Sequence, residues 1–454
     1  MALVKNGDGK APVSLSDYTL YQQKKTMEQI VERNQDDIRQ LNSSINKILD
    51  KFRYINSLND VPQAVVPKMQ LVAHFIKKSD YNSTGSQIRH HRLRDEVRRK
   101  GHALYLMQRY ASYKNIRECE VVGIDAAANE MDASPEVFAP TFHWLRKKWR
   151  ARKKDLQITY HAGEDFLHLL SGLRMMVEAV DFLGMEQGDR IGHGTAAGID
   201  PTLWISRMDK VVKMRKGEWL DDLIVAYGLI ADNVNPYTDL VQLLPKLHNR
   251  IDDLHKEIYG TSNSIKEMRD AWSFRRYDGD MLRGRTHIDK LDFMEAEQVR
   301  KTFEENKAAE TLYRRYLFCK EVKAEYEKLC EVDIRDGLFT AENLYHLQRL
   351  VLHKIAQRGI ALEVLLTSNT AISFYRECDE HHLENWIMED SQENALLVPP
   401  IVVGSDDPGI FMTNIYIEYA RIATYLEHRG YSYTERMHIL EDLMKNGEYY
   451  KFGE

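Results

Sequence analysis

Hydrophobic residues are spaced along this chain in two different patterns. Between Met27 and Phe52 they recur every three or four positions, which predicts a long amphipathic helix and a helical N-terminal segment over residues 1–66. After residue 67, short apolar runs alternate with helical stretches. The runs that read as strands are 70–76, 119–125, 156–161, 190–194, 361–369 and 399–407. Strands that alternate with helices predict βα units, and we therefore expect an α/β fold with a parallel sheet.

A long stretch between the fourth and fifth of these runs has a different texture. Residues 201–358 are rich in charges and in helical periodicity and carry little strand signal. The last helix of this stretch is predicted to begin after Thr340 as its N-cap and to stop at Gly359. We interpret the stretch as a large helical insertion, which leaves the strands to residues 67–200 and 359–454.

The composition is that of a soluble globular protein. Of 454 residues, 43% are hydrophobic and 29% are charged, and the net charge of -6 gives no overall attraction to nucleic acid. The cysteines are scattered without close pairs, which argues against a disulfide framework and against a thiolate zinc site. The N-terminus lacks the apolar core of a signal peptide, and no later run of about 20 apolar residues could cross a membrane. We expect a cytoplasmic protein with no membrane contact and no specific nucleic-acid partner.

Two histidine motifs follow predicted strands, where a parallel barrel keeps its chemistry. Residues 161–164 read His-Ala-Gly-Glu, and residues 190–194 read Arg-Ile-Gly-His-Gly. Taken singly, His161 beside Glu164 is more often a hydrogen-bonded structural pair, and His193 could simply fill a tight corner between two glycines. Two such histidines at successive strand ends favour a catalytic or metal-binding site.

Two adjacent carboxylates, Asp406 and Asp407, follow another apolar run within the sequence Ser-Asp-Asp-Pro-Gly. Adjacent side chains on a strand point to opposite faces, so one carboxylate could ligate a metal while the other meets a substrate. The alternative is a surface turn, because Asp, Pro and Gly all favour turns. The strongly apolar run before the two carboxylates favours the site. A Ser368-Asn369 pair ends the preceding run.

In this order the motifs resemble those of the adenosine and AMP deaminase family of metal-dependent hydrolases. That family carries HAGE, RIGHG, SN and S/T-D-D-P at strands five to eight of a (β/α)8 TIM-type barrel, and residues 123–130 resemble its strand-four sequence I-D-L-A-G-x-E. The resemblance implies a barrel of which strands three to eight are present, with the helical insertion between strands six and seven. This layout, with the wording HAGEDF and GSDDPG, is similar to the enlarged deaminases of RADAR-type antiphage defence.

The resemblance also implies an activity, a cofactor and residue roles. The reaction would be hydrolytic deamination of adenosine or an adenine nucleotide to the inosine form, with release of ammonia and with Zn²⁺ as cofactor. His161 and Asp406 would be zinc ligands, Glu164 would hand a proton to purine N1, and His193 would orient the attacking hydroxide. Asp407 would hydrogen-bond purine N7. The implied substrate contacts are Asp407, Asp125, Ala128, Ser368 and Asn369.

The chain departs from the family pattern in two places. The family has a His-x-His pair on strand one, but no histidine precedes His74, and residues 1–66 read as too helical to supply strands one and two. Two ligands fall short of the three protein ligands usual in a catalytic zinc site. We therefore expect a C-terminal fragment, one half of a split gene, or a degenerate relative. Ala128 stands where the family usually has a glycine that approaches the purine.

These departures leave alternatives to the deaminase. The chain could be a catalytically incomplete scaffold or oligomerisation subunit of the same fold. It could also be another metal-dependent amidohydrolase, such as an amidase or esterase, because fold by itself does not choose chemistry. In each case we expect the helical insertion to build a homo-oligomer.

Overall fold

The computed structural model describes six long stretches of the chain and four short pieces. They are residues 69–79, 89–109, 119–233, 237–278, 290–387 and 396–453, with 3–4, 13–14, 43 and 47. The helix predicted between Met27 and Phe52 lies outside the described residues, apart from positions 43 and 47, which are helical. The chain forms two compact units, and every predicted site residue belongs to the unit made of Val72–Arg94 and Val122–Glu454.

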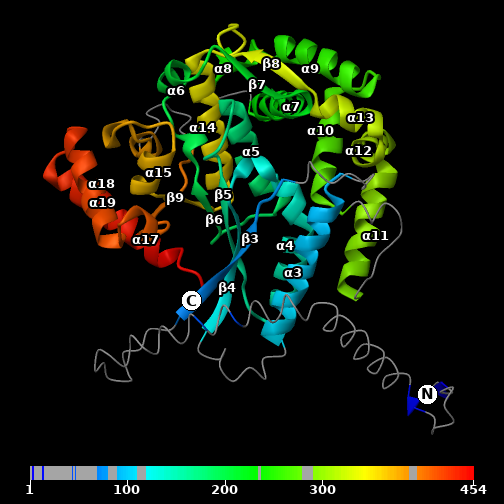
Figure 1. The fold of residues 1–454 in the computed structure, drawn as a ribbon, viewed down its shortest axis with the longest axis horizontal. Coiled ribbons are helices and arrows are strands. Elements are labelled where there is room, and N and C mark those ends of the chain that lie inside the picture. The colour runs from blue at the N-terminus through cyan, green and yellow to red at the C-terminus, as the bar shows by residue number, and fades with distance from the viewer. Residues whose placement is uncertain are drawn as a thin grey trace. The chain divides into compact units, whose positions relative to one another are not determined.

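Six strands form one parallel sheet in the order β10-β9-β6-β5-β4-β3 (Figure 1). They are β3 (Met69–Ile76), β4 (Cys119–Ala127), β5 (Gln157–Ala162), β6 (Arg190–His193), β9 (Ala361–Val364) and β10 (Ile401–Val403). Each strand coincides with one of the six apolar runs, so the α/β class and the parallel sheet are confirmed. The complete (β/α)8 barrel stays a prediction. A separate antiparallel pair joins β1 (Leu3–Val4) to β2 (Val13–Ser14).

The core lies where the strands meet the helices beside them. Ile124, Ile158, Ile191 and Leu362, on four neighbouring strands, are fully buried. The helices that alternate with these strands or follow them along the chain are α3 (His91–Arg109), α4 (Pro135–Arg150), α5 (Leu169–Phe182), α6 (Pro201–Arg207), α14 (Ala341–Gln357), α15 (Leu366–Ile372), α16 (Leu383–Ile387), α17 (Pro408–Phe411), α18 (Ile415–His428) and α19 (Tyr433–Tyr449). Helix α5 is buried almost all round, since it packs against α4, α7 and α14. No helix in the described stretches has the length and apolar character needed to span a membrane.

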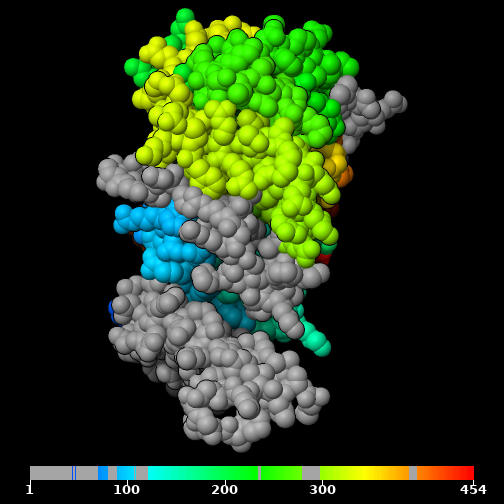
Figure 2. All heavy atoms as spheres, turned by 90° about the vertical axis from the view of Figure 1, so that its right-hand side faces the viewer, coloured from blue at the N-terminus to red at the C-terminus, as the bar shows by residue number. Residues whose placement is uncertain are grey.

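The segment between β6 and β9 is mostly helical, and its role as an insertion into a barrel stays a prediction. Besides α6 and α14, its helices are α7 (Lys216–Asp232), α8 (Thr238–Val241), α9 (Leu244–Tyr259), α10 (Ile265–Ser273), α11 (Lys290–Glu305), α12 (Lys307–Phe318) and α13 (Lys320–Glu327). Figure 2 shows the green and yellow-green helices of this segment as one continuous surface. Because β6 pairs directly with β9, the chain leaves the sheet and returns to the neighbouring position.

The ends of α14 and a pair of short strands in this segment can be compared with the sequence prediction. Thr340 caps α14 through its side chain, and Gly359 follows that helix with a φ of 65°, so both predicted ends are confirmed. The segment also contains an antiparallel pair, β7 (Val211–Arg215) with β8 (Leu329–Asp333), which the sequence did not predict. Apolar and charged residues alternate in these two strands, which is a strand pattern, but each strand has only five residues and stands in a charge-rich, mostly helical stretch.

Candidate active site

The strand register brings the two histidine motifs together. His161 pairs with Gly192 and Ala162 with His193, so the carboxyl ends of β5 and β6 lie side by side. The rings of His161 and His193 are 5.0 Å apart, centroid to centroid. His161 and His193, 32 positions apart in sequence, therefore lie in one site, as the placement of both motifs at strand ends predicted.

Asp125, on β4, holds two imidazoles. Its carboxylate lies 3.0 Å from Nδ1 of His161 and 2.9 Å from Nδ1 of His74, and its side chain is fully buried. Burial alone would raise the pKa of Asp125, but the charge and hydrogen bond of His161, together with those of His74, hold it below its usual value. Burial would lower the pKa of His161, yet Asp125 raises it to about 9. The predicted substrate contact of Asp125 stays a prediction, and in the structure Asp125 orients His161 and His74.

Glu164 and His193 form the central contact of the site. Oε1 of Glu164 lies 2.9 Å from Nδ1 of His193, with side-chain exposures of 11% and 2%. Nδ2 of Asn369 lies 3.0 Å from the same ring nitrogen, and Asn369 is itself fully buried. Nε2 of His381 approaches the Asn369 side-chain oxygen at 3.4 Å. Two predicted residues, Glu164 and Asn369, thus meet at Nδ1 of a third, His193, and His381 contacts the far end of the Asn369 amide.

Asp406 and Ser368 form a second pair. Oγ of Ser368 donates a hydrogen bond to Oδ2 of Asp406 at 2.6 Å. The run 361–369 was predicted to be a strand, and this is wrong for Ser368 and Asn369. Strand β9 ends at Val364, and these two residues belong to α15. The uninterrupted apolar run concealed that change from strand to helix.

Asp407 is exposed and stands immediately before α17. The hydrogen bond to Asp125 is the main cause that raises the pKa of His74, and the carboxylate charge of Asp407 adds to it. The charge of Asp407, which follows β10, therefore reaches His74 on β3, at the other edge of the sheet.

Three predicted site residues have a left-handed backbone, which residues other than glycine rarely adopt. Ala128, His193 and Asp406 have φ values of 82°, 66° and 52°. Such conformations cost free energy and cluster at functional sites. At Ala128 the value also explains why glycine would suit the position, since glycine adopts positive φ without a steric cost.

Two residues that sequence reasoning missed hold the turn that carries Glu164. Oε2 of Glu130 accepts hydrogen bonds from the backbone N–H groups of Gly163 at 2.7 Å and Glu164 at 3.3 Å. Nζ of Lys77 donates to the carbonyl oxygen of His161 at 2.6 Å. Lys77 and Glu130 are 3% and 1% exposed. In the sequence, Lys77 is one of two lysines after a predicted strand, and Glu130 is the last residue of the motif 123–130. Neither pattern indicates that the side chain is buried.

His161 is oriented as a metal ligand would be. Its Nδ1 donates a hydrogen bond to the Asp125 carboxylate, which leaves Nε2 directed elsewhere, as in many histidine ligands of metals. However, no group of three or more His, Cys, Asp or Glu side chains in the described stretches could hold a metal ion. A catalytic zinc site needs three protein ligands. His161 and Asp406, the predicted ligands, do not complete such a site with the other described residues.

Comparisons with known proteins agree with the motifs over part of the chain. The family model for adenosine deaminase matches residues 68–215. A stretch of 101 residues is 36% identical to the aminodeoxyfutalosine deaminase of Streptomyces coelicolor, covering 22% of this chain. The match spans about a fifth of that enzyme's length, 21%. Both comparisons support the adenosine deaminase family, and the family match covers the segment that carries His161, Glu164 and His193.

Proposed function

We propose that this chain catalyses hydrolytic deamination of adenosine or an adenine nucleotide to the inosine form, with release of ammonia. The contact between Glu164 Oε1 and His193 Nδ1, 2.9 Å long, carries the proposal. A buried carboxyl group beside an imidazole can move protons to and from a bound substrate. The two residues lie in the segment that is similar to the adenosine deaminase family.

In this proposal the residues of the site act on the purine ring in turn. Glu164 gives a proton to N1, which makes C6 more electrophilic. His193 holds the attacking water oxygen by hydrogen bonding as it adds to C6. The bond between C6 and the amino nitrogen then breaks. Ammonia leaves with one of the two protons of the water, the oxygen stays as the C6 carbonyl, and the other water proton returns to Glu164. Asp407, exposed in the loop after β10, is the proposed hydrogen-bond partner of purine N7.

Zinc is the metal that the resemblance to the family implies. In the proposal His161 and Asp406 contribute to binding it, and Asp125 orients His161. Because the described residues do not complete a metal site, no chemical step is assigned to the ion. Metal analysis of the purified protein, before and after treatment with a chelator, measures the zinc content directly.

Two alternatives keep the fold and change the function. A non-catalytic scaffold is favoured by the lack of a three-ligand group among the described side chains. Another amidohydrolase activity would use the same Glu164 and His193 on a different substrate. A homo-oligomer built through residues 201–358 and a role in antiphage defence extend the proposal. Sedimentation of the full chain tests the first of these, and protection of cells against phage tests the second.

The deciding experiment is release of ammonia by the purified, zinc-supplemented protein. Adenosine, AMP and ATP test the proposed substrates, and aminodeoxyfutalosine tests the substrate named by the matching relative. Conversion of at least one of the first three supports the proposal. Conversion of aminodeoxyfutalosine alone changes the substrate, and release from none of the four refutes the deaminase.

A further inference from the structure

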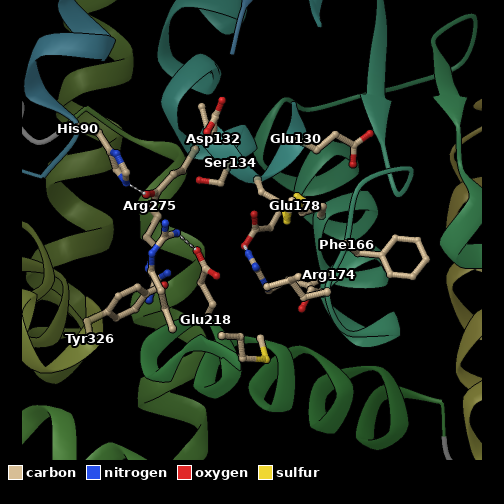
Figure 3. A pocket seen from close by; sticks show the side chains of 18 of the residues that line it. His90, Glu130, Asp132, Ser134, Phe166, Arg174, Glu178, Glu218, Arg275 and Tyr326 are labelled. Atoms are coloured by element: carbon tan, nitrogen blue, oxygen red, sulfur yellow. Dashed lines mark hydrogen bonds and ion pairs between the residues drawn. The ribbon is translucent and has the colours of Figure 1, made fainter. Parts of the chain in front are cut away.

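A cavity lies beside the turn that carries Glu164, within the same unit of the chain as the candidate active site. It has a volume of about 70 Å³. One wall is the short 3-10 helix η2 (Glu130–Asp132) with Ser134, and another is α5, from which Arg174 and Glu178 extend towards each other (Figure 3). The helical segment closes the other side. Its lining residues include Glu218, Arg275, Tyr316 and Tyr326.

Three carboxylate oxygens in the lining have no hydrogen-bond partner among the described residues. They are Oε1 of Glu130, Oε2 of Glu136 and Oε2 of Glu178, and these side chains are only 1% to 2% exposed. One buried donor of the lining, Nη2 of Arg89, is also without a partner. Buried polar atoms are nearly always hydrogen-bonded, and leaving one unmatched is costly. Acceptors therefore outnumber donors, so the cavity favours a ligand that donates hydrogen bonds.

Two guanidinium groups of the lining, those of Arg174 and Arg275, already have carboxylate partners. Nε of Arg174 donates to Asp222 at 2.6 Å, and its Nη1 donates to Oε1 of Glu178 at 2.9 Å. Arg275 binds both oxygens of Asp221. An anionic ligand would have to displace these carboxylates. The paired arginines therefore argue against a phosphate or carboxylate in the cavity.

The charges around the cavity do not balance. Five carboxylates of the lining, Glu130, Asp132, Glu136, Glu178 and Glu218, face four guanidinium groups, Arg89, Arg174, Arg215 and Arg275. Asp222 and Asp221, which bind Arg174 and Arg275, add two more carboxylates behind the lining. Oε1 of Glu136 lies 2.9 Å from Nε2 of His90, but burial lowers the pKa of His90 and so disfavours its charged form. Carboxylates are therefore in excess, which favours a cationic ligand. Burying a charge without such compensation is unfavourable.

We propose that this cavity binds a ligand through a primary ammonium group. An ammonium head carries a positive charge and N–H donors, which suit a lining with an excess of carboxylates and of free acceptor atoms. A metal ion matches less well, since no cluster of metal-ligating side chains occurs among the described residues. The ligand would touch Glu130, whose other carboxylate oxygen holds the backbone N–H groups of Gly163 and Glu164. Ligand binding in the cavity would therefore affect the turn that carries Glu164.

The experiment compares two cations on the full-length protein. Methylammonium chloride donates three hydrogen bonds, and tetramethylammonium chloride has the same charge but donates none. Titration calorimetry and thermal melting at matched ionic strength should show saturable binding of methylammonium only. Putrescine and ammonium chloride then distinguish the amine of a larger molecule from free ammonium. Equal effects of methylammonium and tetramethylammonium, or no effect of either, overturn the proposal.

Variants locate the binding to the cavity. Glu178→Gln keeps the shape of the side chain and removes its charge, and it should weaken methylammonium binding roughly tenfold, as expected for loss of a charged hydrogen bond. Glu136→Gln provides the same test if Glu178→Gln does not fold. The control is Glu310→Gln on α12, which also removes an ion-paired carboxylate, outside the cavity lining. If the control weakens binding as much as both cavity variants do, the site is elsewhere. This binding test does not depend on the proposed deamination.

Discussion

Replacement of Lys77 by methionine tests whether a buried charge stabilises the turn that carries Glu164. Nζ of Lys77 donates to the carbonyl oxygen of His161 at 2.6 Å and lies 4.6 Å from the centre of the Tyr160 ring. Burial lowers the pKa of Lys77, while the charges of Glu130 and Asp125 oppose that shift. The ammonium group therefore stays in place because carboxylates surround it, and methionine keeps the length of the chain without the charge.

The size of the effect follows from two opposing terms. Loss of a hydrogen bond from a charged donor costs ~1.5–3 kcal/mol, and relief of the desolvated ammonium returns part of it, so we expect a net loss of ~1–2 kcal/mol in the free energy of unfolding. Urea denaturation followed by circular dichroism measures this loss. The neighbouring Lys78 has an exposed side chain, so Lys78→Met is the matched control and should change stability by less than about 0.5 kcal/mol. If Lys77→Met proves as stable as Lys78→Met, the reasoning about the buried charge is wrong.

Three further changes have defined outcomes. Burial lowers the pKa of His168 from its ordinary value of 6.5 to about 3. Below pH 6.5 the unfolded chain therefore binds a proton that the folded chain does not, and at pH 5 the free energy of unfolding should be about 2 kcal/mol lower than at neutral pH. His168→Asn should flatten this acid dependence in urea denaturation, whereas replacement of the exposed His438 should leave its slope unchanged. Ala128→Gly should raise the free energy of unfolding by about 0.5–1 kcal/mol because the φ of 82° suits glycine, and a lower urea midpoint would contradict the strain. Asn369→Leu should slow deamination about tenfold by removing the amide from Nδ1 of His193, while Thr370→Val should leave the rate nearly unchanged.

The sheet could be predicted because its strands are long apolar runs between clear helical stretches. Their register then followed from the rule that parallel strands present their carboxyl ends at one edge, which placed His161 next to His193. Elements without a continuous apolar run of their own escaped the same reasoning. The alternating patterns of β7 and β8 stand in a charge-rich helical stretch, and the run that contains β9 continues without a break into α15.

The chemistry of the site was predictable only where motifs carry it. Glu164, His193 and Asn369 stand in recognisable motifs, and they meet in the structure. Lys77 and Glu130 were missed because burial of a charged side chain depends on which segments pack over it, and a local sequence does not contain that information. Asp125 lay in a motif, yet its position between two imidazoles came from pairing of strands distant in sequence.

The most direct test of the account is the rate of ammonia release by Glu164→Gln. This change keeps the shape of the side chain and removes the acid that the proposal assigns to purine N1, so the rate should fall by about 10²–10⁴-fold. The matched control is Glu310→Gln, whose side chain is also 11% exposed but lies on α12. The account predicts a control rate close to that of the unaltered protein. A Glu164→Gln variant that deaminates adenosine, AMP or ATP as fast as the control would contradict the central claim.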